Sequence, residues 1–194
     1  MRILFMGPPG AGKGTQATLV ATALGLPAIS TGDIFRSHVA DLTPLGREAA
    51  RYINAGEYVP DQITNEMIRD RLHQPDAQQG WLLDGYPRTL AQVKELDRIT
   101  SVHGHRLDAV VALSVNEDQL IGRLAHRAAE QGRSDDTEDV IRHRQRLYKE
   151  ETSPLLSVYE KRGLLRTIDG SGEVGDVTQR LLATLAEGST NWST

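Results

Sequence analysis

Cysteine is absent from this chain of 194 residues. Without a thiol, the chain can hold no disulfide, thiolate zinc site, iron–sulfur cluster or cysteine nucleophile. No apolar run approaches the ~20 residues of a membrane span, and the apolar stretch at residues 2–9 is too short for a signal peptide. A net charge of −4 argues against a surface that coats nucleic acid. We therefore expect a soluble, cytoplasmic, single-domain protein that binds neither membranes nor nucleic acid.

Lysine is scarce, because only 4 of the 22 cationic residues are lysine and 18 are arginine. The guanidinium group of arginine is a planar fork that matches phosphate and carboxylate, whereas the lysine ammonium is a point charge. Codon bias would also explain the totals, and from the totals alone we favour it. The positions of the arginines along the chain must therefore decide between the two explanations.

Apolar patterning predicts an α/β fold. Short consecutive apolar runs are typical of parallel strands that are covered on both faces, and the runs lie at 2–6, 27–30, 81–84, 109–115 and 164–169. Helical patterns lie between them, at 13–24, 61–73, 90–103, 117–130, 138–162 and 174–187, and Gly188 is a stop signal for the last. This alternation predicts a doubly wound parallel sheet of five strands with helices on both faces.

Two segments interrupt the alternation. Residues 30–59 are too long for a single crossover and contain two short helical patterns, at 32–40 and 45–55. Residues 127–137 are polar and contain Gly132, which predicts a short loop between helices. The core is then expected at 1–29, 60–126 and 138–188, and the polar tail 189–194 is expected to fray.

A glycine-rich loop follows the first predicted strand and opens the first helix. Residues 7–15 read GPPGAGKGT, which has the G-x-x-x-x-G-K spacing of a phosphate-binding loop in the required strand–loop–helix context. Glycines let successive N–H groups approach phosphate oxygens, and Lys13 adds a full positive charge. Gly14 occupies the position where the strict motif has a hydroxyl for Mg²⁺, and Thr15 follows one residue late. A nucleoside-triphosphate site is predicted, but direct hydroxyl ligation of the metal is not.

An acidic residue ends the third predicted strand. Asp84 follows Trp81, Leu82 and Leu83 at the carboxyl edge of the sheet, where open α/β folds bind ligands. It could hold Mg²⁺, directly or through water, or it could cap the following turn. Arg88 lies four residues later. Because Arg88 and the glycine loop point to the same edge, we favour the functional interpretation.

One polar segment and one set of arginines each have a structural explanation beside a functional one. The segment 30–36 (STGDIFR) could bind a polar ligand, but alone it reads as a helix start capped by Thr31 or Asp33. The arginines flanking the loop 127–137 could form a solvated, charge-balanced face or a clamp on a transferring phosphoryl group. They are Arg123, Arg127, Arg133, Arg142 and Arg144.

Taken together, these motifs resemble the adenylate kinase family of nucleoside monophosphate kinases. The resemblance rests on GPPGAGKGTQ (7–16), STGDIFR (30–36) and WLLDGYPRTLAQ (81–92), and it extends through GRSDDTEDVIRHR to IDGSGEV, covering residues 1–185. It implies a P-loop fold in which 30–59 form a small helical insertion that binds the monophosphate. The loop 127–137 would be a short lid, and without cysteine it would carry no structural zinc.

The resemblance also implies roles for individual residues. On the ATP side it places Gly10, Ala11, Gly12, Lys13, Gly14, Thr15, Arg123, Arg127 and Gly172. On the AMP side it places Thr31, Arg36, Glu57, Tyr58, Val59, Gly85, Tyr86, Pro87, Arg88, Gln92, Arg133 and Arg144. Tyr86 replaces the commoner Phe of the family. Thr31 and Gln92 go with adenine as acceptor base, whereas the similar uridylate/cytidylate kinases tend to have Ala and Asn near these places.

The implied reaction is reversible transfer from Mg-ATP to AMP, giving two ADP. The acceptor phosphate is already anionic, so no general base is needed, and the six histidines show no metal spacing. Catalysis would be positioning and charge stabilisation by Lys13, Arg88, Arg123, Arg133 and Arg144, with Mg²⁺ bridging oxygens. We expect a monomer acting on ATP, AMP and ADP. A UMP/CMP kinase and a nucleotide-dependent switch ATPase remain as alternatives.

Overall fold

A parallel five-stranded sheet forms the centre of the computed structural model, which describes residues 1–102, 104–116, 119–124 and 137–189. The strand order is β2-β3-β1-β4-β5, and all four neighbouring pairs are parallel. The strands are β1 (Arg2–Met6), β2 (Ala28–Ser30), β3 (Trp81–Asp84), β4 (Ala109–Ser114) and β5 (Leu165–Asp169). The predicted five-stranded parallel fold is confirmed, with strand ends that differ from the prediction by at most one residue.

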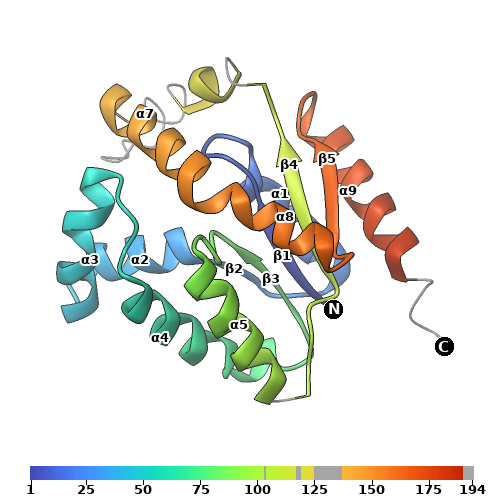
Figure 1. Cartoon of the computed structure of the whole chain (residues 1–194), viewed down its shortest axis with the longest axis horizontal. Helices are drawn as coiled ribbons and strands as arrows, with labels where there is room; N and C mark the ends of the chain where they lie inside the picture. The colour runs from blue at the N-terminus through green and yellow to red at the C-terminus, as the bar shows by residue number, and fades with distance from the viewer. Residues whose placement is uncertain (103, 117–118, 125–136, 190–194) are drawn as a thin grey trace.

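Helices connect the strands as the alternation predicts (Figure 1). They are α1 (Lys13–Leu24), α2 (Thr31–Ala40), α3 (Pro44–Ala55), α4 (Asp61–Leu72), the 3₁₀ turn η1 (Pro75–Ala77), α5 (Leu90–Val102), α7 (Glu138–Leu147), the π-helical segment η3 (Tyr148–Thr152), α8 (Pro154–Lys161) and α9 (Val174–Ser189). Residues 119–124 are also helical, and the rest of the helix predicted at 117–130 lies outside the described residues.

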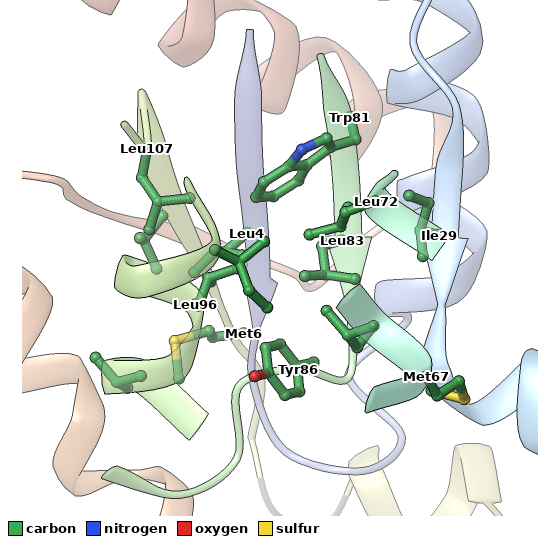
Figure 2. Close-up of a cluster of buried hydrophobic side chains, with 14 of the residues drawn as sticks. Leu4, Met6, Ile29, Met67, Leu72, Trp81, Leu83, Tyr86, Leu96 and Leu107 are labelled. Atoms are coloured by element: carbon green, nitrogen blue, oxygen red, sulfur yellow. The ribbon is translucent and has the colours of Figure 1, made fainter. Parts of the chain in front are cut away.

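Both faces of the sheet are covered, because successive side chains of a strand point to opposite faces. On one face, Leu4 and Met6 of β1 pack with buried side chains of α4, α5 and α8. Figure 2 shows part of this cluster, including Leu4 of β1, Leu83 of β3 and Leu96 of α5.

On the other face, Ile3 and Phe5 of β1 pack with Val20 of α1 and with Leu181 of α9. Alternate residues of β1 therefore enter different clusters although every apolar residue of the strand is buried. This double burial is the reason why the strand reads as a continuous apolar run.

The helix predicted over residues 138–162 is not continuous. It divides into α7, η3 and α8. In η3 the N–H of Ser153 donates to the carbonyl of Tyr148, five residues earlier, at 2.8 Å. Pro154 is the first residue of α8, where its missing N–H costs nothing within a new first turn. Residues 149–154 (KEETSP) contain no apolar residue, so the apolar pattern is itself interrupted where the helix changes type.

The segment 30–59 forms a pair of helices beside the sheet, in line with the two patterns predicted there. The two helices α2 and α3 approach so closely that a Cβ on Gly46 would lie 1.9 Å from the carbonyl oxygen of His38. Thr43 caps α3 by accepting from the N–H of Gly46 at 3.0 Å, and Gly56 ends it with a φ of 73°. A glycine at position 46 is therefore required for this pairing.

The C-terminal helix differs slightly from the prediction. It extends through Ser189, one residue past the glycine expected to stop it, and the remainder of the predicted tail lies outside the described residues. Among the helices that the structure describes, none is long and apolar enough to cross a membrane.

Candidate active site

The glycine loop joins β1 to α1 at the carboxyl edge of the sheet. Gly12 precedes α1 with a φ of 86°, and no side chain caps the first turn of the helix. The N–H groups of that turn therefore face the loop with their partial positive charge. The Nζ of Lys13 donates to the carbonyl oxygens of Gly7 at 2.8 Å and Pro8 at 2.9 Å, which folds the side chain back over the loop.

Asp84 ends β3 opposite the first turn of α1. A Cβ on Gly14 would lie 3.9 Å from Oδ2 of Asp84. Burial raises the pKa of this carboxyl, and the charges of Lys13 and Arg88 partly offset that effect. Its Oδ1 is buried and, among the described residues, has no hydrogen-bond partner. Because the structure shows no bond from this carboxylate to the following turn, the capping alternative finds no support.

Arg88 is held at the same edge by its own main chain and by Gln92. The N–H of Arg88 donates to Oε1 of Gln92 at 2.7 Å, and its Nε donates to the carbonyl oxygen of Gly85 at 2.8 Å. Gln92 is almost fully buried, and its Nε2 donates to Oδ1 of Asp61 at 2.6 Å. The buried amide thus fixes the start of α5 against α4 and orients Arg88.

The start of α2 corrects the predicted cap. The side chain of Ser30, and not that of Thr31 or Asp33, accepts from the N–H of Asp33 at 3.3 Å. Thr31 is buried, and its hydroxyl donates to the carbonyl oxygen of Gly85 at 3.0 Å. Thr31 is the first residue of the helix, so its side chain turns toward β3 and away from the helix axis. Arg36, one turn later, pairs with Asp33.

Tyr86 belongs to the core and to the site at once (Figure 2). Its ring is buried, and its hydroxyl donates to Oδ1 of Asn65 at 2.7 Å. Burial raises the pKa of this phenol above its ordinary value. A phenylalanine would fill the same space but leave the amide of Asn65 without this bond. The tyrosine therefore adds a tie between β3 and α4.

Two cavities open along this edge of the sheet. Cavity I lies between the segment 30–59 and the core, and cavity II lies over the glycine loop. Every described residue predicted for the AMP side lines cavity I, and every described residue predicted for the ATP side lines cavity II. Four cationic side chains line both cavities, namely Lys13, Arg36, Arg88 and Arg144.

The segment after α3 contacts α7 directly. A Cβ on Gly56 would lie 2.8 Å from Cγ1 of Val140 and 3.0 Å from Cγ of Arg144. The Oε1 of Glu57 lies 2.8 Å from Nε2 of His143. These contacts place Arg144 against the wall of cavity I, although it is far from that wall in the sequence.

Cavity II is bounded on its far side by the loop after β5. The Nη2 of Arg123 donates to the carbonyl oxygen of Gly170 at 3.2 Å. Arg180, on α9, donates to the carbonyl oxygens of Asp169 and Ser171. Gly172 follows with a φ of 98° and lines the cavity. Two arginines thus hold three successive carbonyl groups of this loop.

Arg127 and Arg133, which were also predicted for the site, lie outside the described residues. Sequence reasoning missed several lining residues of cavity I, because their apolar or hydroxyl side chains carry no chemical signal of a binding site. They are Phe35, Ile53, Thr64, Tyr148 and Thr152. Thr152 lies in the segment ETSPLL (151–156), in which no residue pattern indicates a cavity wall.

The side chains near Asp84 bear on the predicted Mg²⁺ site, because they decide how many ligands the protein can supply. Within the described ranges, no group of three or more His, Asp or Glu side chains could hold a metal ion. A single buried carboxylate beside a phosphate loop suits an ion that arrives with a nucleotide and takes most of its ligands from phosphate and water.

Comparisons with known proteins agree with this geometry. The family model described as adenylate kinase matches residues 5–164. An adenylate kinase from Nocardioides sp. is 60% identical over 95% of this chain and 97% of its own length. Those from Kocuria rhizophila and Thermobifida fusca are 58% and 53% identical, each over 95% of this chain and 98% of their own length.

Proposed function

Since this chain belongs to the adenylate kinase family, we propose that it transfers the γ-phosphoryl group of Mg-ATP reversibly to AMP, giving two ADP. The observation that carries the proposal is the wall of four cations between cavity I and cavity II. Two nucleotides bound in the two cavities would meet at that wall with their phosphates. Cations at this position stabilise charge where it is transferred.

The chemistry needs few groups from the protein. An oxygen of the AMP phosphate attacks the γ-phosphorus, and the bond from that phosphorus to the β–γ bridging oxygen breaks, so ADP leaves from the donor. The attacking oxygen carries no proton that must be removed at neutral pH. Lys13, Arg88, Arg123, Arg133 and Arg144 are therefore assigned to orientation and charge stabilisation.

Nucleotide binding follows from the lining of each cavity. ATP is assigned to cavity II, where its phosphates would meet the N–H groups of residues 10–15, with Arg123, Arg127 and Gly172 farther along. AMP is assigned to cavity I, with Thr31 and Gln92 toward the base. The hydroxyl of Thr31 already donates to Gly85, so toward an adenine amino group it would act as an acceptor.

Magnesium fits the site at Asp84. The buried Oδ1 of Asp84 at the carboxyl edge, which has no hydrogen-bond partner among the described residues, is a suitable donor for such an ion, directly or through water. When bound, the ion would offset the negative charge of the phosphate groups. Burial that raises the pKa of Asp84 disfavours an isolated carboxylate, so a cation beside it would favour the ionised form.

Two segments are assigned to closure over the substrates. The insertion 30–59 would close cavity I, and the short lid 127–137 would close cavity II. Such closure excludes water, which would otherwise accept the phosphoryl group. The contacts of Gly56 and Glu57 with α7 support a shared movement, because α7 directly follows the proposed lid in the sequence.

A phosphotransfer assay across four acceptors tests the function. With Mg-ATP, the purified protein is expected to form ADP with AMP at least about tenfold faster than with CMP, UMP or dTMP, because a buried hydrogen-bonding site rejects mismatched bases. Equal rates with all four acceptors would overturn the AMP assignment. ADP formation only by slow hydrolysis, without any acceptor dependence, would instead favour the switch ATPase.

A further inference from the structure

Arg88, Tyr58 and Thr152 form a closed ring of contacts at the wall of cavity I. The guanidinium carbon of Arg88 lies 4.9 Å from the ring centroid of Tyr58. The hydroxyl of Tyr58 lies 2.8 Å from Oγ1 of Thr152, and Oγ1 of Thr152 lies 2.9 Å from the carbonyl oxygen of Arg88. The ring thus begins at the side chain of Arg88 and returns to its main chain.

The direction of the hydrogen bonds in this ring follows from counting protons. A carbonyl oxygen only accepts, so Thr152 must donate its single hydroxyl proton to Arg88. Thr152 then has no proton left for Tyr58, and Tyr58 must donate to Thr152. The two hydroxyls therefore form one ordered chain that ends on the main chain of Arg88, and each bond depends on the other.

Three distant parts of the chain meet in this ring. Tyr58 belongs to the end of the segment 30–59, Arg88 follows β3, and Thr152 is the last residue of η3. Thr152 is buried, with 5% of its surface exposed. The π-helical turn, closed by the bond from Ser153 to Tyr148, brings this hydroxyl to the cavity wall. Single π-type turns are common at functional sites.

The contacts leave the outer part of the Arg88 fork available for a ligand. Its Nε donates to Gly85, and one face of the guanidinium rests on the ring of Tyr58. Neither Nη1 nor Nη2 donates a hydrogen bond to another described residue. These two groups form the edge that binds a phosphate in bidentate fashion.

We propose that Tyr58 and Thr152 are positioning residues that fix Arg88 for the phosphate of the acceptor monophosphate. The inference rests on the proposed function, and it assigns to the side chains of Tyr58 and Thr152 a role beyond lining the cavity. Tyr58 orients the guanidinium plane through its face. Thr152, held by Tyr58, fixes the main chain from which that guanidinium extends.

Removal of single hydroxyl groups tests the chain. Tyr58→Phe keeps the aromatic face and Thr152→Val keeps the volume, so each removes one hydrogen bond. We expect each variant to lower kcat/KM for AMP about three- to tenfold, as the loss of one hydrogen bond predicts. KM for ATP should change less than about twofold. The kcat/KM for AMP of the double variant should equal that of the worse single variant, because both changes break the same chain of hydrogen bonds.

Two further variants separate positioning from ordinary packing. Thr152→Ser retains the donor and should restore most of the kcat/KM lost in Thr152→Val. Tyr58→Leu removes the aromatic face as well, and an additional fall of about two- to fivefold is expected from the lost cation–π contact. Melting temperatures of all variants should remain within a few degrees of the wild type.

Tyr52→Phe is the matched control. Its ring carries the guanidinium of Arg51 at 4.7 Å, and its hydroxyl accepts from Nη2 of the same arginine at 2.8 Å. This pair has the same chemistry but lines neither cavity. Tyr52→Phe should therefore leave kcat/KM for AMP unchanged.

Equilibrium binding keeps this test distinct from that of the proposed function. Calorimetry with AMP alone should show a Kd three- to tenfold higher than that of the wild type for Tyr58→Phe and for Thr152→Val, whatever the wild-type turnover is. Binding and kinetics that match the Tyr52→Phe control would overturn the proposal. So would losses that multiply in the double variant, or losses that fall equally on ATP. Absence of AMP phosphorylation by the wild type would refute the proposed function only.

Discussion

At the scale of single residues, Lys13, which we propose as a charge-stabilising residue, is held by the glycine loop itself. Its ammonium donates to two carbonyl oxygens of the glycine loop, so these oxygens partly compensate its charge. A phosphate in cavity II offers a stronger, fully charged partner at the same place. The side chain then exchanges carbonyl contacts for phosphate contacts with little movement of the backbone.

Replacement of Lys13 by methionine should therefore affect turnover far more than folding. We expect Lys13→Met to lower kcat by about 10²- to 10³-fold, the range for loss of one preorganised charge-stabilising group. The melting temperature should change by only a few degrees. Lys94→Met, at an exposed position of α5, is the control and should keep full activity. Turnover within tenfold of the wild type would remove Lys13 from the mechanism.

Residue-level prediction from the sequence could place side chains at a common edge of the sheet where a motif fixes both type and spacing. The residues of the glycine loop, Asp84 and Arg88 come together at one edge, because the carboxyl ends of β1 and β3 are neighbours in a parallel sheet. It failed at the cap of α2, since Ser30, Thr31 and Asp33 are all good capping types. Only the backbone path decides which of three adjacent polar residues lies just before the first turn.

At the scale of secondary-structure elements, the loop after β5 depends on arginines from two helical segments. Arg180 of α9 and Arg123 of the segment 119–124 together hold the carbonyl groups of residues 169–171. The pKa of Asp169 is lowered by hydrogen bonds from Ser171, which keeps its carboxylate charged beside Arg180. The loop that lines cavity II is therefore braced from both ends.

Arg180→Met should weaken the donor side selectively. With the brace removed, KM for ATP is expected to rise about three- to tenfold, because the loop must be ordered at a cost when ATP binds, while KM for AMP stays unchanged. Arg166→Met is the matched control. Arg166 also donates to two carbonyl oxygens, of Gly163 and Leu165, but at the opposite end of β5. Equal effects of the two substitutions on KM for ATP would contradict this prediction.

An ion network between α4 and α5 should make stability depend on pH. Hydrogen bonds from Arg98 and from Arg69 hold the pKa of Glu95 at about 2, below its ordinary value of 4.5. A carboxyl group whose pKa is lower in the folded than in the unfolded state stabilises the fold at pH values above the unfolded-state pKa. That stabilisation is lost as the pH falls from about 4.5 toward 2. Because both arginines are partly exposed, the contribution at pH 7 is about 1 kcal/mol.

Urea unfolding of Glu95→Gln between pH 3 and 7 measures this contribution. The wild type should exceed the variant by about 1 kcal/mol at pH 7, and the difference should shrink below about pH 4.5 as the unfolded chain takes up its proton. Glu160→Gln serves as control, since Glu160 is exposed on α8 and makes no ion pair among the described residues. A difference that is independent of pH would contradict the assignment.

The bounds of strands and helices could be predicted accurately where apolar residues follow a regular pattern in the sequence. The bounds of β1, β3 and α1 coincide with their apolar patterns. The interval 138–162 shows the limit, because the sequence predicts one helix there although residues 149–154 contain no apolar residue and the structure has α7, η3 and α8. Thr152, the last residue of the π-helical turn, contacts Tyr58 and the main chain of Arg88. Those contacts join residues separated by more than sixty positions, which no local pattern records.

At the scale of the whole molecule, two cavities with one common wall predict simultaneous occupation by two nucleotides. A ligand that binds only the folded state raises the free energy of unfolding by RT ln(1 + [L]/Kd). A non-hydrolysable ATP analogue and AMP should each raise the melting temperature by a few degrees at saturating concentration. Their effects should be at least additive when both are present.

Differential scanning calorimetry with each nucleotide and with the pair checks this expectation. Tyr52→Phe again serves as a control with unaltered cavities. No further rise on addition of the second nucleotide would mean that both compete for one cavity. That result would be incompatible with direct transfer across the shared wall.

The shared wall of Lys13, Arg36, Arg88 and Arg144 has a kinetic consequence for the reverse direction. When the reaction starts from ADP, two ADP molecules must bind, one in each cavity. One is the phosphoryl donor and the other is the acceptor. The initial rate should then rise with the square of the ADP concentration while ADP is dilute. The rate of the protein would therefore change more steeply with the concentration of ADP than with the concentration of ATP or AMP alone.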